Sequence, residues 1–460
     1  MVASQLQAGR GLAQMSEQHE ISQLVTAVFR AWQQAGINWL VLRNYESLPH
    51  STTNDIDVLV ERGQLRQAEQ ALLAAATQTG FRVHNRVEFA TLALYLSSQQ
   101  SNAQAHFDLF TTLKWRGFEF VACDGFLRRK GSKDLFFIPH LADETATKLL
   151  ASLVYTGKVK EKYKPSIVAG LQAERAAISE LLTPTYGAGH AQFLVAAGAQ
   201  ARWDDIEAAT GALRRALVLR QLTHRPWHAI KGLLVDARRL VRRFLQPPGV
   251  TVVLCGADGS GKSTAAREVM DRLKVTFPAQ KVQQFHWKPP LFTGGRQAAR
   301  APTTDPHSRP TRNPAVSLCY FGFHWLEFFL ASHLRLRPVT FRGGLVLIDR
   351  GYYDFFVDQR RYRLRVPPAV VRLGHLLLEK PDLVVLLDAP AGVLQQRKQE
   401  VPLAETERQR AAYLALVRGL DNGRVVDATQ ALEKVGADIG RAILDFMAER
   451  AKRRWGLLHQ

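Results

Sequence analysis

The spacing of apolar residues differs between the two halves of the chain. Between residues 21 and 164, apolar positions recur with the period of a helix at 21–35 and 66–79. Strands are predicted between these helices for the runs "NWLVLRN" and "NDIDVLV", and after the second helix for "TLALYLS" and "AHFDLFT". This half is therefore predicted to be an α+β domain.

In the second half, short continuous apolar runs alternate with helical stretches. The runs are "VTVVLCG", "KVQQFHW", "GGLVLIDR", "PDLVVLLDAP" and "GRVVDAT". Strands that are apolar on both sides belong to parallel sheets covered by helices on both faces. The second half is therefore predicted to have an α/β fold with a parallel sheet.

These patterns define the predicted domains. The first 20 residues contain no apolar segment of the kind found in signal peptides, and we expect a disordered tail there. Residues 21–164 form the α+β domain, residues 165–247 a very basic helical connector, and residues 248–460 the second domain. The last boundary is set by Pro247, Pro248 and Gly249, because this run breaks the preceding helix.

One apolar stretch, "AVSLCYFGFHWLEFFLASHL", approaches the ~20 residues that span a bilayer. It contains His324, Glu327 and His333, and charges at mid-bilayer depth are costly. A buried helix of the second domain is therefore expected here, in preference to a transmembrane span.

The composition indicates the charge of the expected partners and the expected cellular compartment. The chain has 460 residues, of which 46% are hydrophobic and 22% charged, as expected of two globular domains. Its formal net charge of +20 favours anionic partners such as nucleotides, phosphorylated glycans, nucleic acid or an acidic membrane. Cys123, Cys255 and Cys319 lack metal or redox spacing, so we expect a reducing cytoplasm and no disulfide framework.

The run "GADGSGKST" at 256–264 fits the phosphate-loop pattern G-x-x-x-x-G-K-[ST] between a predicted strand and a predicted helix. Backbone N–H groups of such a loop wrap phosphate oxygens, and the next helix adds its positive N-terminal end. Lys262 would reach the β- and γ-phosphates of ATP, and the Ser263 hydroxyl would bind Mg²⁺. The predicted nucleotide-binding residues are Gly256, Asp258, Gly259, Ser260, Gly261, Lys262, Ser263 and Thr264.

The end of the strand "GGLVLIDR" adds two candidate catalytic residues. Asp349 stands where a carboxylate can hold Mg²⁺ or its water shell, and Arg350 beside it can bind an anionic acceptor. Asp388 ends the strand "PDLVVLLDAP" in a similar way, and we expect it to be structural.

Together these motifs resemble those of thymidylate kinases. "GADGSGKST", "IDRGYYDFFVDQ", "PDLVVLLDAPAGVLQQRK" and "VVDATQALEKVGADI" look like that family's phosphate loop, Asp-Arg motif, fourth strand with its helix, and last strand. The resemblance spans 249–449. It implies a nucleoside-monophosphate-kinase fold and phosphoryl transfer from ATP, with Mg²⁺, to another phosphate. It further implies that Asp258 contacts the acceptor sugar, Arg350 the acceptor phosphate, and Arg397 the region of the donor adenine.

The sequence departs from that family on the acceptor side. The Arg-Glu-Pro-Gly stretch after the second strand is absent, and "FHWKPPLFTGGR" stands in its place. The resemblance therefore supports the donor chemistry and leaves the acceptor open. The long basic loop at 287–313 either binds a polyanionic acceptor or is a solvated loop.

A second candidate site lies in the first half. Asp55 and Asp57 alternate along "NDIDVLV" and so point to one face, and Asp108 lies on a later strand that can pair alongside. Three such carboxylates can hold one or two Mg²⁺ ions, which activate a hydroxyl and steady a leaving pyrophosphate. The layout resembles the nucleotidyltransferase superfamily, whose metal-binding acids these three residues match.

That superfamily has a Gly-Ser turn before its acidic pair, and here "LRNYESLPHSTTNDID" replaces it. Either Arg43 substitutes as a phosphate binder or the site has lost activity. The lead "LRNYE" with "DIDVLV" also looks like nucleotidyltransferase-like proteins that occur with thymidylate-kinase-like domains among bacterial surface-polysaccharide functions. This resemblance implies a role in nucleotide-sugar or polysaccharide metabolism.

The connector ends in a basic amphipathic helix at 227–245. Its apolar stripe contains Trp227, Ile230, Leu234, Val241 and Phe244. Its basic residues are Lys231, Arg238, Arg239, Arg242 and Arg243. Such a helix can lie on the inner membrane as a peripheral contact, or pack its stripe between the two domains, which we favour. Nucleic-acid binding is disfavoured because no recognition motif accompanies the charge.

Three functions fit these features. The leading one is a kinase of the thymidylate kinase type that acts on a nucleoside monophosphate or another phosphorylated acceptor. The second is nucleotidyl transfer by the N-terminal aspartates, and the third is a non-catalytic nucleotide-binding scaffold at the membrane surface. A homodimer is compatible with all three.

Overall fold

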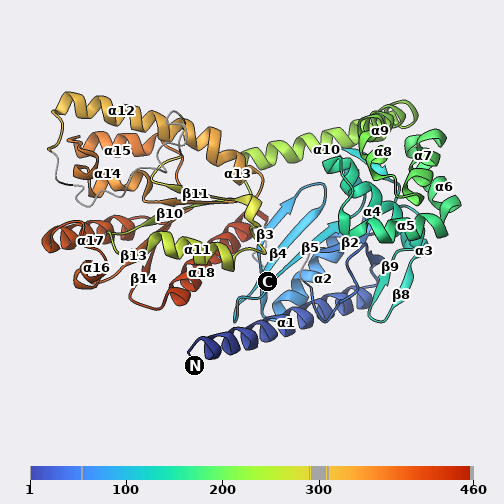
Figure 1. Cartoon of the computed structure of the whole chain (residues 1–460), viewed down its shortest axis with the longest axis horizontal. Coiled ribbons are helices and arrows are strands. Elements are labelled where there is room, and N and C mark those ends of the chain that lie inside the picture. The colour runs from blue at the N-terminus through green and yellow to red at the C-terminus, as the bar shows by residue number, and fades with distance from the viewer. Residues whose placement is uncertain (1, 53–54, 290, 292–306, 308–309, 456–460) are drawn as a thin grey trace. The chain divides into compact units, whose positions relative to one another are not determined.

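The computed structural model describes residues 2–52, 55–289, 291, 307 and 310–455, and for residues 2–14 the backbone alone. The chain forms two compact units (Figure 1). The first contains Met1–Arg242 and Ala451–Gln460, and the second contains Arg243–Arg450.

The first unit contains a five-stranded sheet of order β1-β2-β5-β4-β3. Its strands are β1 (Trp39–Val41), β2 (Ile56–Val60), β3 (Phe81–Glu88), β4 (Leu92–Ser98) and β5 (Gln104–Phe110). Strands β2 and β5 are parallel, and the other neighbours are antiparallel. The helices α1 (Val2–Gln34) and α2 (Leu65–Gln78) share a core with the sheet, and Trp32 Nε1 donates a 2.8 Å hydrogen bond to Ala68 O within it.

The first unit continues through two β-hairpins and a set of helices. They are β6 (Leu113–Trp115), β7 (Phe118–Val121), α3 (Phe126–Arg129), β8 (Gly131–Lys133), β9 (Phe136–Ile138), α4 (Leu141–Thr156), α5 (Lys164–Ala173), α6 (Arg175–Tyr186), α7 (Ala188–Ala199), α8 (Trp203–Ala208), α9 (Thr210–His224) and α10 (Pro226–Leu245). One hydrophobic core joins strand β7 with helices α4 to α9. It extends from Leu40 to Ala229, so these helices are integral to the first unit.

The structure corrects two of the predicted segments. The expected disordered tail is the beginning of α1, which runs without a break from Val2 to Gln34; no proline interrupts it and Ala, Leu, Gln and Glu favour a helix. The expected connector at 165–247 is helical, but up to Arg242 it belongs to the first unit because its helices bury apolar side chains in the core around α4.

The second unit is built on a parallel five-stranded sheet of order β11-β12-β10-β13-β14. Its strands are β10 (Val250–Cys255), β11 (Val282–His286), β12 (Leu345–Asp349), β13 (Leu383–Asp388) and β14 (Gly423–Asp427), and all five predicted strands are confirmed. Val252 and Leu254 lie in one hydrophobic core and Val253 in another, so both faces are covered. This mixed α/β unit is consistent with a P-loop kinase fold.

The helices of the second unit contribute to these two cores and to a third cluster that contains Phe321, Phe355 and Val371. They are α11 (Lys262–Arg272), α12 (Pro314–Ala331), α13 (Arg337–Phe341), α14 (Asp354–Val357), α15 (Pro368–Leu376), α16 (Ala391–Arg397), α17 (Leu403–Arg418) and α18 (Leu432–Trp455), the last of which ends in residues assigned to the first unit. Val269 of α11 and Ile439 of α18 lie in one core, and Tyr413 of α17 lies in the other.

The apolar stretch singled out in the sequence forms α12, a π-helical turn (Ser332–Leu336) and α13. By length and composition alone, Pro314–Phe341 could cross a membrane, and 33% of its most apolar window is buried. The expectation of a buried helix is therefore met only in part: Phe321 and Phe328 are buried, whereas Leu318 is 50% exposed.

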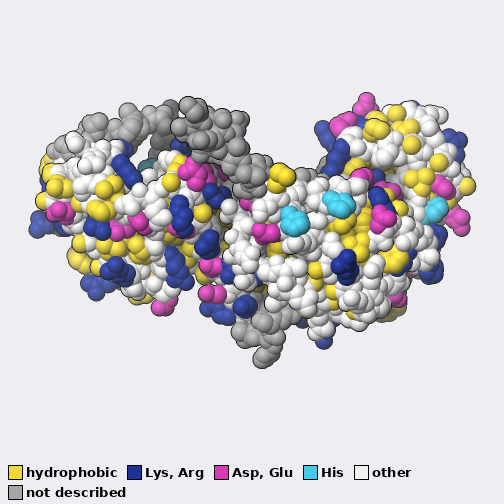
Figure 2. Space-filling view, turned by 90° about the horizontal axis from the view of Figure 1, so that it is seen from below, with side chains coloured by type: hydrophobic (Ala, Val, Ile, Leu, Met, Phe, Trp, Pro, Cys, Tyr) yellow, Lys and Arg dark blue, Asp and Glu magenta, His cyan; other side chains and the backbone are white. Residues whose placement is uncertain are grey.

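Basic side chains are spread over the face of the molecule seen in Figure 2, where acidic and apolar side chains lie between them. On that face the large positive charge is therefore not gathered into one patch.

Candidate functional site

The phosphate loop connects β10 to α11. Gly259 and Gly261 have φ angles of +83° and +84°, which side chains other than glycine rarely adopt. A Cβ atom at Gly259 would also lie 2.5 Å from Leu394 O and 3.5 Å from Arg397 Cβ, whereas one at Gly261 would meet nothing within 4 Å among the described residues. The loop is therefore closely packed on one side and open at Gly261.

Lys262, the first residue of α11, is folded back against this loop. Its Nζ donates hydrogen bonds to Gly256 O at 2.8 Å, to Ala257 O at 3.0 Å and to Ser260 Oγ at 3.3 Å. Burial lowers the pKa of Lys262, and the positive charge of Arg350 lowers it further. A phosphate placed on the loop offers charged acceptors in place of these neutral oxygens, and charged acceptors bind an ammonium group more strongly.

Asp349, at the end of β12, lies next to the start of α11. Ser263 Oγ donates a 2.9 Å hydrogen bond to Asp349 Oδ2, and His286 Nδ1 lies 3.2 Å from the same oxygen. Asp349 Oδ1 is buried and has no hydrogen-bond partner among the residues that the structure describes. Burial opposes ionisation, but His286, Lys262 and Arg350 together lower the pKa of Asp349 to about 2.

An ionised carboxylate with one unused oxygen, beside a hydroxyl, matches the oxygen ligands that Mg²⁺ prefers. Ser263 and Asp349, both predicted from the sequence as metal ligands, are therefore brought together in a geometry that fits this ion.

Arg350 follows Asp349 in an unusual backbone conformation, with φ of +79° and ψ of −66°. For a bulky side chain such a conformation is strained, and strain of this kind is concentrated at functional sites. The Arg350 guanidinium forms an ion pair with Asp258 of the phosphate loop, and a longer one of 3.6 Å with Asp354. The structure thus brings Arg350 and Asp258, two predicted catalytic residues, into direct contact.

A second arginine, Arg361, binds the other oxygen of Asp258. It also donates a 2.9 Å hydrogen bond to Glu400, in the segment between α16 and α17. Burial disfavours ionisation of Asp258, but Arg350, Glu400, Arg361 and Lys262 outweigh it and lower the pKa of Asp258. The carboxylate of Asp258 therefore occupies a site for an anion between two guanidinium groups.

Sequence reasoning missed Arg361 and Glu400. The only signal is the arginine-rich run "DQRRYRLR", and such a run is also typical of a solvated surface. The chain distance from Asp258 to Arg361, 103 residues, gives no local pattern that joins them.

The other residues assigned in the sequence lie around this group. Arg397 ends α16, where it packs beside Gly259 and donates a 2.8 Å hydrogen bond to Ala428 O. Thr264 lies in the first turn of α11. Asp388 is held by Arg410 through two hydrogen bonds of 2.8 and 2.9 Å, as a structural ion pair would be.

Most of the predicted basic loop lies outside the described residues. Its described part includes Lys288, which is buried rather than solvated. Lys288 Nζ forms an ion pair with Glu327 and donates a 2.9 Å hydrogen bond to His324. His307, also in this loop, bonds to Asp358 at 2.9 Å.

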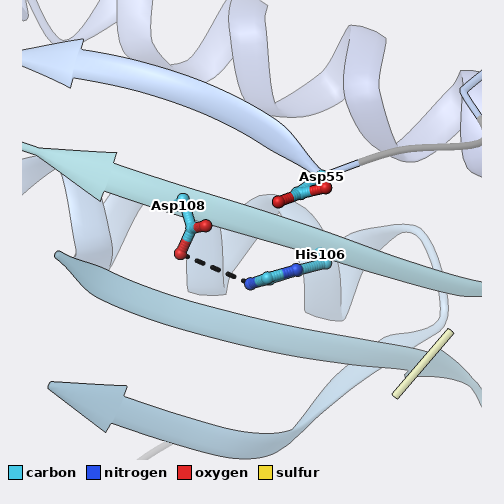
Figure 3. A group of neighbouring side chains, drawn as sticks. All are labelled: Asp55, His106 and Asp108. Atoms are coloured by element: carbon cyan, nitrogen blue, oxygen red, sulfur yellow. Dashed lines mark ion pairs between the residues drawn. The ribbon is translucent and has the colours of Figure 1, made fainter. Parts of the chain in front are cut away.

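The candidate site of the first unit lies where β2 and β5 run side by side. Asp57 and Asp108 are partners in the parallel register. The side chains of Asp55, His106 and Asp108 turn toward one another (Figure 3). Each offers one possible metal-ligand atom, and these three atoms lie within 4.8 Å of one another. His106 Nε2 is 3.4 Å from Asp108 Oδ1, and the His106 ring stacks on Tyr95.

Asp57 is not part of this group. It is 2% exposed, and Arg43 Nε donates a 2.6 Å hydrogen bond to its Oδ2. Burial raises the pKa of Asp57 to about 6, although Arg43 opposes that change. Asp57 therefore pairs with Arg43 while His106 joins Asp55 and Asp108, and the assignment of Asp55, Asp57 and Asp108 as metal ligands stays a prediction.

The alternation of strand side chains contains a signal for His106, because it stands two residues before Asp108 and so faces the same side. An imidazole nitrogen beside two carboxylates is a mixed donor set, which suits Mn²⁺ or Zn²⁺ as well as Mg²⁺.

Comparisons with known proteins bear on the class of the chain. No family model matches it. The thymidylate kinase of Thermosynechococcus vestitus is 27% identical to it over 237 residues, which cover 46% of this chain and 92% of that protein. The solved structure of thymidylate kinase from Ehrlichia chaffeensis has 14% sequence identity and a TM-score of 0.31, and the match covers 43% of this chain and 100% of that one.

The sheet and the phosphate-loop geometry of the second unit are those expected of a nucleotide-kinase-like protein. More narrowly, about half of this chain is similar to thymidylate kinase, at low sequence identity. Both matched proteins are named as thymidylate kinases, and neither name refers to a nucleotidyltransferase. The nucleotidyltransferase resemblance of residues 21–164 therefore stays a prediction.

Proposed function

We propose that the second unit is an ATP-dependent phosphotransferase that moves the γ-phosphoryl group of ATP to a phosphorylated acceptor. The observation that carries this proposal is the pairing of Ser263 with Asp349 beside the buried Lys262. Phosphoryl transfer needs little from a protein beyond positioning and charge stabilisation, and these three residues can supply both on the donor side.

On the donor side, the loop amides and the start of α11 would bind the phosphates of ATP. Lys262 would give up its carbonyl partners for phosphate oxygens. Ser263 and Asp349 would hold Mg²⁺, which would offset the charge of the phosphates. Arg397, beside Gly259, would lie near the adenine, as the resemblance to thymidylate kinases implies.

On the acceptor side, Arg350 and Arg361 already bind one anion, the carboxylate of Asp258. An acceptor phosphate would replace that carboxylate, because a dianion binds two guanidinium groups more strongly than a monoanion does. Asp258, once released, would contact a hydroxyl of the acceptor, the role that the resemblance implies. This exchange would couple acceptor binding to rearrangement at the phosphate loop.

The acceptor is a nucleoside monophosphate or another phosphorylated small molecule such as a sugar phosphate. Support for an acceptor other than thymidylate comes from the run "FHWKPPLFTGGR", which replaces the family's Arg-Glu-Pro-Gly stretch. A surface-polysaccharide or nucleotide-sugar pathway is part of this proposal, as is a cytoplasmic location, which the free thiols of Cys123, Cys255 and Cys319 support.

The test is an acceptor screen with γ-labelled ATP and the purified full chain. Nucleoside monophosphates and sugar phosphates are offered one at a time, and the label is followed into the acceptor. We expect one acceptor class to become labelled, with loss of labelling in Lys262→Ala and no loss in Lys274→Ala, a change at an exposed lysine just after α11. Absence of labelled product with every acceptor, or labelling that Lys262→Ala leaves intact, contradicts the proposal.

Tight ATP binding without any turnover would instead support a nucleotide-binding scaffold. Equilibrium dialysis with labelled ATP, run beside the acceptor screen, separates this outcome from a protein that does not bind ATP at all.

A second function is favoured by the group Asp55, His106 and Asp108 in the first unit. We propose nucleotidyl transfer there, in which a bound divalent ion would activate the attacking hydroxyl and steady the pyrophosphate. Pyrophosphate release from a nucleoside triphosphate would be measured with Mg²⁺, Mn²⁺ and Zn²⁺ in turn. Asp55→Asn with Asp108→Asn should abolish it, whereas Lys262→Ala and Asp134→Asn, the latter at an exposed turn, should not.

A further inference from the structure

Helix α10 (light green in Figure 1) carries an exposed apolar face. Trp227 is 80% exposed, Leu234 66% and Leu245 68%, which are high values for large apolar side chains. The other large apolar residues of the helix that are exposed are Ile230, Leu233, Val235, Leu240, Val241 and Phe244. We propose that α10 binds a membrane, lying along an anionic lipid surface with this face in the lipid.

The helix is held to the first unit by its opposite, small-residue face. Ala229 and Gly232 are its buried residues. A Cβ atom at Gly232 would collide with the backbone of Gly117, in the turn of the β6–β7 hairpin. This close approach fixes the rotation of α10 about its axis.

Apart from Val235, which lies beyond the basic residues on the other side, these exposed residues form a continuous sector of the helix. At 3.6 residues per turn, the residues from Leu240 round to Trp227 cover roughly 140° of the circumference, and Ala229 and Gly232 lie outside that range. From Trp227 to Leu245 the sector is roughly 27 Å long at 1.5 Å per residue. A sector of this width and length matches a planar interface rather than a single-residue pocket.

Basic residues border one side of this sector. Lys231 and Arg238 are exposed and adjoin Trp227 and Leu234 around the helix. Asp236 is the one acidic residue of α10, and it forms an ion pair with Arg239 at 3.5 Å on the packed side. The border therefore presents positive charge, which is complementary to anionic lipid headgroups.

The positive charge of α10 also argues against two other roles for this face, which are contact with a second copy of the helix and a transmembrane span. Two antiparallel copies of α10 brought face to face would place their basic borders on the same side, which costs free energy. With five basic residues in its 20, α10 is also too charged to cross the bilayer, so it would lie in the interface.

The test is flotation of the full chain with lipid vesicles, either of phosphatidylcholine alone or with about one third phosphatidylglycerol. We expect binding to the anionic vesicles and little to the neutral ones. Lys231→Gln with Arg238→Gln should weaken binding roughly 25-fold, since each basic residue near an anionic surface contributes about a factor of five. The matched control is Arg418→Gln with Arg424→Gln, two exposed arginines of the second unit.

The apolar sector is tested separately by Leu234→Glu with Val241→Glu, which should abolish flotation. Leu432→Glu, at the start of α18 where the leucine is 39% exposed, is its control and should float as the wild type does. Circular dichroism shows whether each variant keeps its helix content. The proposal is overturned if wild-type chain does not float with anionic vesicles, or if the glutamate pair floats unchanged. A concentration-dependent dimer that the glutamate pair dissociates, without flotation, assigns the face to a second copy.

Discussion

Ser263 Oγ donates a 2.9 Å hydrogen bond to Asp349 Oδ2 across 86 residues of sequence. The bond forms because β10 and β12 are parallel neighbours, so that the helix after one strand starts beside the end of the other. The ligands of a hard cation are thereby placed before any nucleotide binds.

Asp349→Asn should reduce ATP-dependent transfer by roughly 100-fold or more, because the amide keeps the shape of the side chain but removes the charge that would hold Mg²⁺. The measurement is the initial rate as a function of Mg²⁺ concentration. Asp388→Asn is the matched control, since Asp388 ends strand β13 of the same sheet but is bound by Arg410. A full rate for Asp349→Asn at ordinary Mg²⁺ concentrations would remove this residue from the metal site.

Arg361→Met should raise the KM for the phosphorylated acceptor by roughly 10-fold to 100-fold, the range for loss of one hydrogen bond to a charged group. The acceptor-independent hydrolysis of ATP should change much less, because Arg361 contacts Asp258 and Glu400 rather than Lys262. Arg360→Met, at the exposed neighbouring residue, is the control. Equal losses in the two variants would mean that Arg361 has no special part in acceptor binding.

The second unit should lose stability on acidification through His324. Burial, and then the charge of Lys288, lower the pKa of His324 from 6.5 to about 4. A histidine whose pKa is lowered in the folded state contributes stability that is present in full above pH 6.5 and is lost as the pH falls through about 4. The free energy of unfolding should therefore fall in this window.

His324→Gln should make that fall smaller, because the glutamine amide can accept the hydrogen bond from Lys288 without titrating. Urea unfolding curves at pH 7, 5.5 and 4.5 measure the difference between wild type and variant. His333→Gln, at an exposed histidine of the same helical stretch, controls for the loss of an imidazole. A difference that is constant over this pH range would contradict the assignment.

Divalent ions should stabilise the first unit through Asp55, His106 and Asp108. An ion present at about 100 times its Kd raises the free energy of unfolding by about 2.7 kcal/mol. The measurement is the melting temperature with and without Mn²⁺, in an Asp349→Asn background that silences the proposed ion site of the second unit.

In that background, Asp55→Asn with Asp108→Asn should remove the metal-dependent shift, and Asp134→Asn should leave it unchanged. A shift that persists when both ligand aspartates are replaced would place the ion elsewhere in the chain.

Much of the second unit could be predicted because its signals are local. Each of its five strands is a short apolar run, and a parallel strand covered on both faces requires such a run. The loop around Gly259 and Gly261 needs residues that accept positive φ angles, so the glycine spacing itself is informative. The Asp-Arg motif ends the buried strand β12, so the apolar run before it indicates where it lies.

The site residues that were missed depend on long-range contacts. Glu400 and Arg361 meet Asp258 only when the segments after β12 and α16 come together. In the first unit, Asp57 looks equivalent to Asp55 in sequence, yet Asp57 is buried and pairs with Arg43, whereas Asp55 is exposed and lies beside His106 and Asp108. No pattern of neighbouring residues distinguishes these two aspartates.

The sequence by itself determined the phosphate loop, the strands of the second sheet and the amphipathic nature of 227–245. Each of these features depends on residues that lie only a few positions apart in the sequence. Only the tertiary structure decided that His106 joins Asp55 and Asp108, that two arginines hold Asp258, and that the apolar face of α10 is exposed. Periodicity and backbone conformation are set within one turn or one strand, whereas burial and charge pairing are set by segments that meet only after the chain has folded.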